Sequence, residues 1–120
     1  VLEDARFQPA FAAGSRAEVS VVGQVRVRGE TRMVSGKIDR IAVEEGRVLL
    51  VDFKTDYAPA HSLADVPASY LTQMALYRAI LQPLYPDKAI ECALLYTGGA
   101  KLVALPSERM DAALEALANS

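Results

Sequence analysis

The most constraining feature of this chain is a short run of consecutive apolar residues that ends in an acid and a base. Residues 48–51 read VLLV, and Asp52, Phe53 and Lys54 follow directly. Apolar side chains at consecutive rather than alternate positions are typical of a strand covered on both faces. Because side chains alternate along a strand, Asp52 and Lys54 share one face. The sequence thus predicts a central strand that carries two charges side by side at its end.

The sequence around this strand predicts a meander followed by a helix. Alternating residues, with turns at 29–30 and 45–46, predict three successive strands over residues 18–55. Helical spacing over residues 68–85 predicts a helix that starts behind Pro67 as a first-turn proline. We expect its buried face to carry Tyr70, Met74, Tyr77, Leu81 and Leu84.

The remainder of the chain predicts two more strands and a closing helix. Pro83 and Pro86 end the preceding helix, and the segments AIECALLYT and KLVALP then alternate like strands around a Gly-Gly turn. Residues 107–118 predict a helix with Ser107 as its cap and a buried face made of Met110, Leu114 and Leu117. The opening segment up to Gly14 is expected to be a short helix or a loop.

The composition sets the size and class of the domain. With 120 residues, of which 52% are hydrophobic, the chain is long enough for one globular core and too short for two. It begins at Val1 and shows no signal peptide, so we expect residues 1–120 to be a single domain from a longer protein. No stretch approaches the roughly 18 consecutive apolar residues of a membrane-spanning helix, and no membrane partner is expected.

The net charge and the cysteine content restrict the function. A net charge of −2 argues against a domain that grips nucleic acid by overall electrostatics, because neutralising phosphates needs concentrated Lys and Arg. A DNA-cutting domain of this composition would need another part to deliver its substrate. Cys92 is the single cysteine, so it forms no internal disulfide, cannot by itself hold zinc or an iron–sulfur cluster, and is expected to be buried.

A second carboxylate is expected near the charged strand end. Asp39 stands in GKIDR toward the end of the preceding strand, and antiparallel neighbours joined by a short turn bring such positions together. Asp39 and Asp52 in one cleft would repel each other, which Mg²⁺ or Mn²⁺ would relieve. Lys54 would then hold or deprotonate water and stabilise charge on a phosphate. A simpler alternative stays open, in which Asp52 and Lys54 pair with each other or point into solvent.

The spacing of these residues resembles that of a known family. G-x-I-D-R, then V-D-F-K-T thirteen residues on, then a helix with Q-x-x-x-Y, is similar to the PD-(D/E)xK nuclease domain at the C-terminal end of RecB and, more closely, AddA proteins. The resemblance covers nearly the whole chain and implies an α/β, restriction-endonuclease-like core. Its central mixed sheet would hold about five strands, a three-strand meander and, after a helix, two more, flanked by helices. Residues 1–120 would be the C-terminal nuclease domain of a helicase–nuclease.

The resemblance also implies the roles of the charged residues. In the family the first acid and the D-x-K pair bind metal and activate water. Asp39, Asp52 and Lys54 would accordingly be catalytic. Asp39, Asp52 and the backbone carbonyl of Phe53 would hold Mg²⁺, or Mn²⁺ in its place, and no iron–sulfur cluster is expected in this chain.

Further residues are expected to support the site. Gln73 and Tyr77 match the Q-x-x-x-Y motif, which lies beside the active site and helps position nucleic acid; the alternative is that Tyr77 is core and Gln73 merely exposed. Glu18 either supports the site or is an exposed strand-end carboxylate, and Thr55 is expected to bond a phosphate or the strand end. Positive charge is concentrated on the first two strands, at Arg26, Arg28, Arg32, Lys37 and Arg40. These side chains either contact phosphate or are only the solvent-exposed outer face of the hairpin.

The chain departs from the family pattern at one position. RecB-type domains carry a histidine or an acid on a helix upstream of the first strand. The single histidine here, His61, lies after Lys54 and is expected to be a solvated loop residue. The missing ligand would precede Val1 in the parent protein, which would leave the fragment weakly metal-binding or inactive on its own.

The implied activity is metal-dependent hydrolysis of DNA, mainly of single strands that leave a helicase, in double-strand break repair and recombination in the bacterial cytoplasm. The implied partners are the helicase portion of the parent chain and an AddB-type subunit. One alternative is an inactive nuclease-like module that holds DNA or has a structural role. Another is a free-standing RecB-like exonuclease, but such enzymes commonly carry a cysteine cluster that this chain lacks. Asp52→Ala and Lys54→Ala are each expected to abolish cleavage and preserve the fold.

Overall fold

A computed structural model describes residues 16–27, 29–54, 66–96 and 101–119 of the chain. In chain order the elements are β1 (Arg16–Val27), β2 (Glu30–Val43), β3 (Arg47–Lys54), α1 (Ala68–Leu81), the 3-10 turn η3 (Gln82–Leu84), β4 (Ala89–Tyr96), β5 (Lys101–Leu105) and α2 (Ser107–Asn119). This order confirms the predicted meander, helix, two strands and closing helix. The expectations for the opening segment up to Gly14, and for Arg28, Thr55 and His61, lie outside the described residues.

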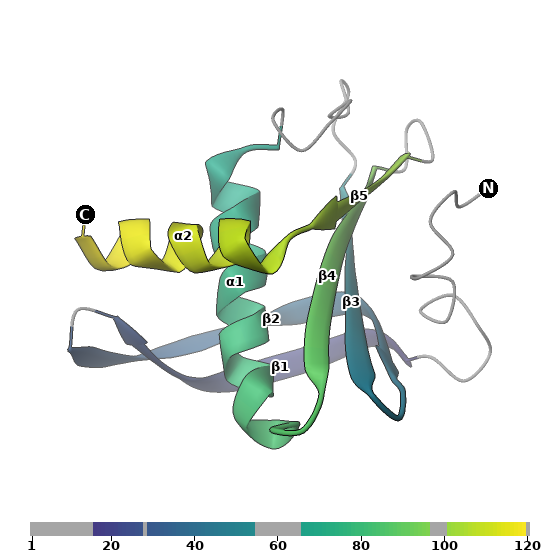
Figure 1. Ribbon diagram of the computed structural model, residues 1–120, viewed down its shortest axis with the longest axis horizontal. Helices are drawn as coiled ribbons and strands as arrows, with labels where there is room; N and C mark the ends of the chain where they lie inside the picture. The colour runs from purple at the N-terminus through teal and green to yellow at the C-terminus, as the bar shows by residue number, and fades with distance from the viewer. Residues whose placement is uncertain (1–15, 28, 55–65, 97–100, 120) are drawn as a thin grey trace.

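The five strands form one mixed sheet in the order β1-β2-β3-β4-β5. All neighbouring pairs are antiparallel except β3 and β4, which run parallel over eight residue pairs from Arg47–Ala89 to Lys54–Tyr96. Parallel neighbours need a crossover connection, which α1 supplies here. Figure 1 shows α1 lying across the sheet, with the long β1–β2 hairpin behind it and α2 crossing its upper half. The expected mixed sheet with β3 at its centre is confirmed.

The core lies between the sheet and the two helices. One face of the sheet packs with α1 and α2 in a large cluster to which all five strands contribute. The opposite face carries a smaller cluster of buried residues, Ala42, Leu49, Val51 and Ala93. Leu49 and Leu50 point to opposite faces and are both 0% exposed, so β3 is covered on both sides as its apolar run predicts.

Helix α1 is anchored on the sheet along most of its length. It begins just after Pro67, whose carbonyl accepts the N–H groups of Tyr70 and Leu71, so the proline stands one position before the helix. Met74, Tyr77 and Leu81 are buried as predicted. The prediction for Leu84 is wrong, because its side chain is 68% exposed. Pro83 lies in η3, and the tighter 3-10 turn rotates Leu84 off the apolar stripe of the helix.

Helix α2 packs on α1 through the face that its sequence predicts. Met110 is fully buried, and Leu114 and Leu117 are half-buried against the large cluster. The prediction of Ser107 as the cap is wrong by one position, because Ser107 is the first residue of the helix and the carbonyl of Pro106 accepts the first helical N–H groups. Neither described helix has the length and hydrophobicity needed to cross a bilayer.

Candidate active site

The charged end of β3 meets the first two turns of α1. The Nζ of Lys54 lies 2.8 Å from Oδ2 of Asp52 and donates a hydrogen bond of 2.8 Å to Oε1 of Gln73. The side chains of Lys54 and Asp52 are only 12% and 8% exposed, so the pair is shielded from water. Asp52 and Lys54 share the face of β3 that looks toward α1, as their spacing predicts.

Asp39 joins β2 to this cluster. The regular pairing of β2 with β3 stops at Arg40 and Val51, and beyond it Oδ2 of Asp39 accepts the backbone N–H of Phe53 at 2.8 Å. The Asp39 side chain thus accepts a backbone N–H at the strand end, beyond the last β2–β3 pair. This bond holds the Asp39 carboxyl beside the residue that separates Asp52 from Lys54.

The two carboxyl groups are close enough to affect each other. Burial raises the pKa of Asp52 from 3.8 to about 6, and a hydrogen bond with the Asp39 carboxyl adds to the rise, whereas the bond from Lys54 opposes it. Desolvation and a neighbouring carboxyl both disfavour the ionised form. A perturbed carboxyl with a specific charged partner is a feature of functional sites.

Gln73 and Tyr77 extend the cluster along α1. Nε2 of Gln73 donates a hydrogen bond of 3.3 Å to the hydroxyl of Tyr77, one turn further along the helix. The Tyr77 ring is buried and lies against the backbone of Gly36 on β2, where a Cβ would stand 2.8 Å from two ring carbons. A side chain at this position would collide with the ring, so Gly36 leaves the room that Tyr77 occupies. The structure therefore places Tyr77 in both the core and the polar network.

Tyr70 is a site residue that the sequence assigned only to the buried face of the helix. The Nζ of Lys54 lies 4.2 Å from the centroid of its ring. Tyr70 is three residues before Gln73, which puts both on one side of α1. The three-residue spacing from Gln73 is the sequence feature that could have identified Tyr70 as a site residue. The position of Gly36 inside a strand could have identified its contact with Tyr77, since a glycine inside a strand often marks a close approach of the backbone.

The donor set fits a hard divalent cation. Within the described residues no group of three or more His, Cys, Asp and Glu side chains is arranged to hold a metal ion. Asp39 and Asp52 nevertheless bring two carboxyl groups together, and Asp52 is buried. Mg²⁺ is commonly bound through one or two carboxylates, with water and substrate phosphate completing its shell. Two carboxylates without sulfur or imidazole suit Mg²⁺ or Mn²⁺ better than Zn²⁺.

The other expected residues are placed in different ways. Arg40 pairs in register with Val51, whose side chain packs on the face opposite α1, so Arg40 points away from Lys54. Glu18 is exposed and stands opposite Asp39, between the pairs Ala17–Arg40 and Val19–Ile38. Among the described non-glycine residues, Glu18 alone has a positive φ, which is 54°. Backbone strain of this kind clusters at functional sites.

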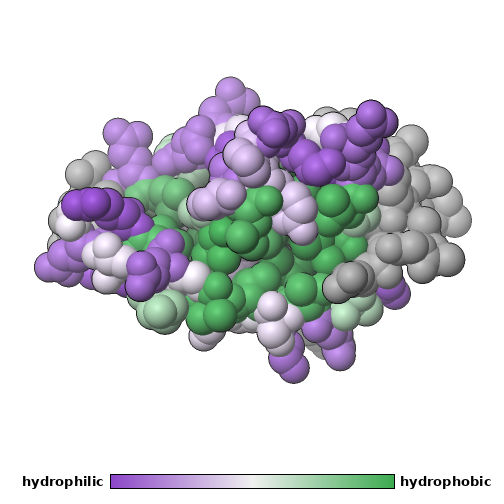
Figure 2. Space-filling model, turned by 90° about the horizontal axis from the view of Figure 1, so that it is seen from below, coloured by the Kyte–Doolittle hydropathy of each residue, from purple (hydrophilic) through white to green (hydrophobic). Residues whose placement is uncertain are grey.

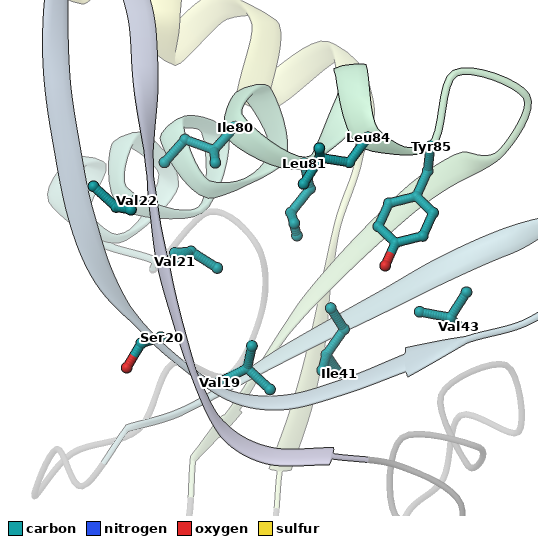
Figure 3. A pocket seen from close by; sticks show the side chains of 10 residues that line it. All are labelled: Val19, Ser20, Val21, Val22, Ile41, Val43, Ile80, Leu81, Leu84 and Tyr85. Carbon is teal, nitrogen blue, oxygen red and sulfur yellow. The ribbon is translucent and has the colours of Figure 1, made fainter.

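Two hollows differ in chemistry. A groove of about 420 Å³ runs between β2 and α1 next to Gln73 and Tyr77, with hydroxyl groups of Ser35, Ser69 and Thr72 in its lining. A larger hollow of about 610 Å³ lies at the far end of α1 (Figure 3). Its ten lining residues carry no carboxylate, amine or imidazole, so this hollow holds no charged pair like that of Asp52 and Lys54.

Comparison with known proteins identifies one family. The family model described as PD-(D/E)XK nuclease superfamily matches residues 2–119. No curated protein matches significantly. Among the solved structures, SSO0001 is similar over 84% of this chain, with 13% sequence identity and a TM-score of 0.48. The match covers 48% of that protein, so this chain spans about half of its length.

Proposed function

The chain belongs to the PD-(D/E)XK nuclease superfamily, and from this membership we propose that it is a Mg²⁺-dependent deoxyribonuclease. The observation that supports the proposal best is the position of the Lys54 ammonium, 2.8 Å from both Asp52 and Gln73, in a shielded cluster that includes Asp39. An isolated strand-end ion pair would not need a second carboxyl that raises the pKa of the first.

The residues divide the chemistry between them. Asp39 and Asp52 would hold Mg²⁺, or Mn²⁺ in its place, together with the backbone carbonyl of Phe53. When bound, such an ion polarises a phosphoryl oxygen and lowers the pKa of water. Lys54 would orient the attacking water and stabilise the negative charge that grows as the new P–O bond forms and the P–O bond to the leaving oxygen breaks. Gln73 fixes the ammonium, and Tyr77 fixes Gln73.

The substrate proposed is DNA, mainly single strands that a helicase delivers. The net charge of −2 supports delivery by another part, because this domain cannot attract DNA strongly by itself. The groove that Gln73 lines is the path proposed for the strand. We place the domain in a bacterial helicase–nuclease of the RecB/AddA type, which acts in the cytoplasm with an AddB-type subunit in double-strand break repair and recombination.

An apolar surface supports packing against such a neighbour. Val22, Val43 and Leu84 are 65%, 51% and 68% exposed around the larger hollow. Figure 2 shows hydrophobic side chains gathered across this face. Contiguous exposed apolar residues commonly mark interaction surfaces. The test is a Leu84→Glu variant, whose affinity for the helicase portion and the AddB-type subunit is compared with that of the wild type. Equal affinity would show that this surface does not contact either partner.

Cleavage of labelled single-stranded DNA by the purified parent protein, with helicase activity followed in parallel, tests the activity. Wild type is compared in Mg²⁺, Mn²⁺ and EDTA with Asp52→Ala and Lys54→Ala. Each substitution is expected to lower the rate by about 100-fold or more, because it removes a charge that acts at the reacting phosphate. Asp111→Ala serves as a control, since its carboxylate is exposed on α2 and pairs with Arg78 in the last turn of α1.

The outcomes separate the enzyme from its alternative. Metal-dependent cleavage that both site variants lose, with helicase activity retained, would assign the nuclease to this site. Wild-type protein that binds DNA without cleaving it in either metal would make the domain an inactive DNA-holding module. Cleavage that persists in both variants would refute the roles proposed for Asp52 and Lys54.

A further inference from the structure

The Lys54 ammonium is held from three directions by three kinds of contact. Asp52 supplies a negative charge at 2.8 Å, Gln73 a neutral oxygen at 2.8 Å, and Tyr70 the face of an aromatic ring at 4.2 Å. The first contact comes from the strand of Lys54 itself. The other two come from the first two turns of α1, which reaches the site only through the crossover.

A lysine in this position needs such contacts. Its four-carbon stem is flexible, and its ammonium is a point charge without preferred geometry. A ring attracts a cation through its quadrupole, and this attraction is stronger when the cation is desolvated, as at an exposure of 12%. A carboxylate in place of the ring would also hold the ammonium, but it would neutralise its charge. The ring holds Lys54 without adding a second negative charge to that of Asp52, so it neutralises the ammonium less than a second carboxylate would.

We propose that Tyr70 is a positioning residue that orients the Lys54 ammonium through its ring and thereby sets the rate of phosphodiester hydrolysis. This inference rests on the proposed function and adds a residue that the D-x-K and Q-x-x-x-Y motifs do not include. Tyr70 acts through Lys54, so it changes kcat and leaves KM for DNA nearly unchanged.

The competing explanation is that Tyr70 is only a packing residue. Its side chain is half-buried and lies against the large core cluster, a role that an apolar leucine would fill in part. The two explanations differ for substitutions that keep or remove the ring. Tyr70→Phe keeps the ring and removes the hydroxyl, Tyr70→Leu keeps apolar bulk and removes the ring, and fluorinated phenylalanines weaken the quadrupole at nearly constant shape.

The test measures kcat and KM for single-stranded DNA cleavage, with thermal unfolding of every variant. We expect Tyr70→Phe to stay within about 3-fold of the wild-type kcat and Tyr70→Leu to lose about 5- to 30-fold, at unchanged KM. Across the fluorinated series log kcat should fall steadily while the unfolding temperature stays constant. The ring-current shift of the Lys54 ε-methylene protons, observed by NMR without metal or DNA, should persist in Tyr70→Phe and disappear in Tyr70→Leu.

Several results would overturn the inference. Full activity of Tyr70→Leu, or a loss in Tyr70→Phe as large as in Tyr70→Leu, would show that the ring does not position Lys54. A fluorinated series with constant kcat would show the same even if Tyr70→Leu were unstable. Cleavage retained by Lys54→Ala would overturn the proposed function as well. Loss in Lys54→Ala combined with full activity of Tyr70→Leu would overturn only the role of Tyr70.

Discussion

Replacing Asp52 with asparagine should abolish cleavage and stabilise the metal-free protein. The pKa of Asp52 rises from 3.8 to about 6 in the folded chain, mainly because its carboxyl is buried and next because it meets Asp39. A rise of this size corresponds to about 3 kcal/mol between the two protonation states, since each pKa unit is worth about 1.4 kcal/mol. The attraction of Lys54 is already contained in this value, so the ionised form is disfavoured on balance. Asparagine has the same shape and no charge.

The dependence on pH follows from the direction of the shift. A carboxyl whose folded-state pKa is raised stabilises the fold fully below 3.8, and this contribution is lost as the pH rises through about 6. Near pH 8 in EDTA, we therefore expect Asp52→Asn to exceed the wild type by about 1 to 3 kcal/mol in the free energy of unfolding. The difference should shrink toward about pH 4, where the wild-type carboxyl is protonated.

Urea unfolding in EDTA at both pH values measures the effect. Mg²⁺ at high concentration should stabilise the wild type and not Asp52→Asn, because only the wild type keeps both carboxylates. The control is Asp111→Asn, whose 66% exposed carboxylate should change stability by less than about 1 kcal/mol at either pH. If Asp52→Asn is as stable as the wild type or less stable near pH 8 in EDTA, the buried charge of Asp52 does not lower the free energy of unfolding, and the reasoning is refuted.

Two further substitutions test the packing around the site. Gly36→Ala places a Cβ against the Tyr77 ring and should cost about 1 to 3 kcal/mol in unfolding free energy, with a several-fold loss of cleavage through Gln73 and Lys54. Gly46→Ala, where nothing lies within 4 Å, is the matched control, and equal effects of the two would contradict the Tyr77 contact. Met110→Ala should lower the free energy of unfolding by about 2 to 5 kcal/mol, because Met110 is fully buried. A decrease of less than about 1 kcal/mol in urea unfolding would mean that α2 packs only loosely on the rest of the domain.

The sequence predicted most of the fold because its patterns follow from burial. The apolar run of β3 has to be covered on both faces, and Leu49 and Leu50 are both fully buried. Leu84 was misjudged because Pro83 changes the helical period just where the stripe seemed to continue. The parallel pairing of β3 with β4 was not specified, since a sequence pattern fixes neither strand order nor direction.

The site was foreseen where it depends on local geometry. Asp52 and Lys54 are two residues apart on one strand, and the β2–β3 hairpin brings Asp39 to the same end. The Lys54–Gln73 bond depends on how α1 docks across the sheet, and the residues alone did not predict it. Tyr70 and Gly36 were missed for the same reason. The catalytic and metal-binding roles of these residues stay predictions.

The burial of Cys92 gives the protein a native reporter of its own opening. This is the single cysteine of the chain, 1% exposed on β4, where it pairs in register with Leu50 of β3 and Leu105 of β5. Burial raises the pKa of its thiol to about 12, so the reactive thiolate is absent while the sheet is intact. A colorimetric thiol reagent should react only when β4 separates from its neighbours. The rate of that reaction then reports the stability of the sheet next to the site, without an added label.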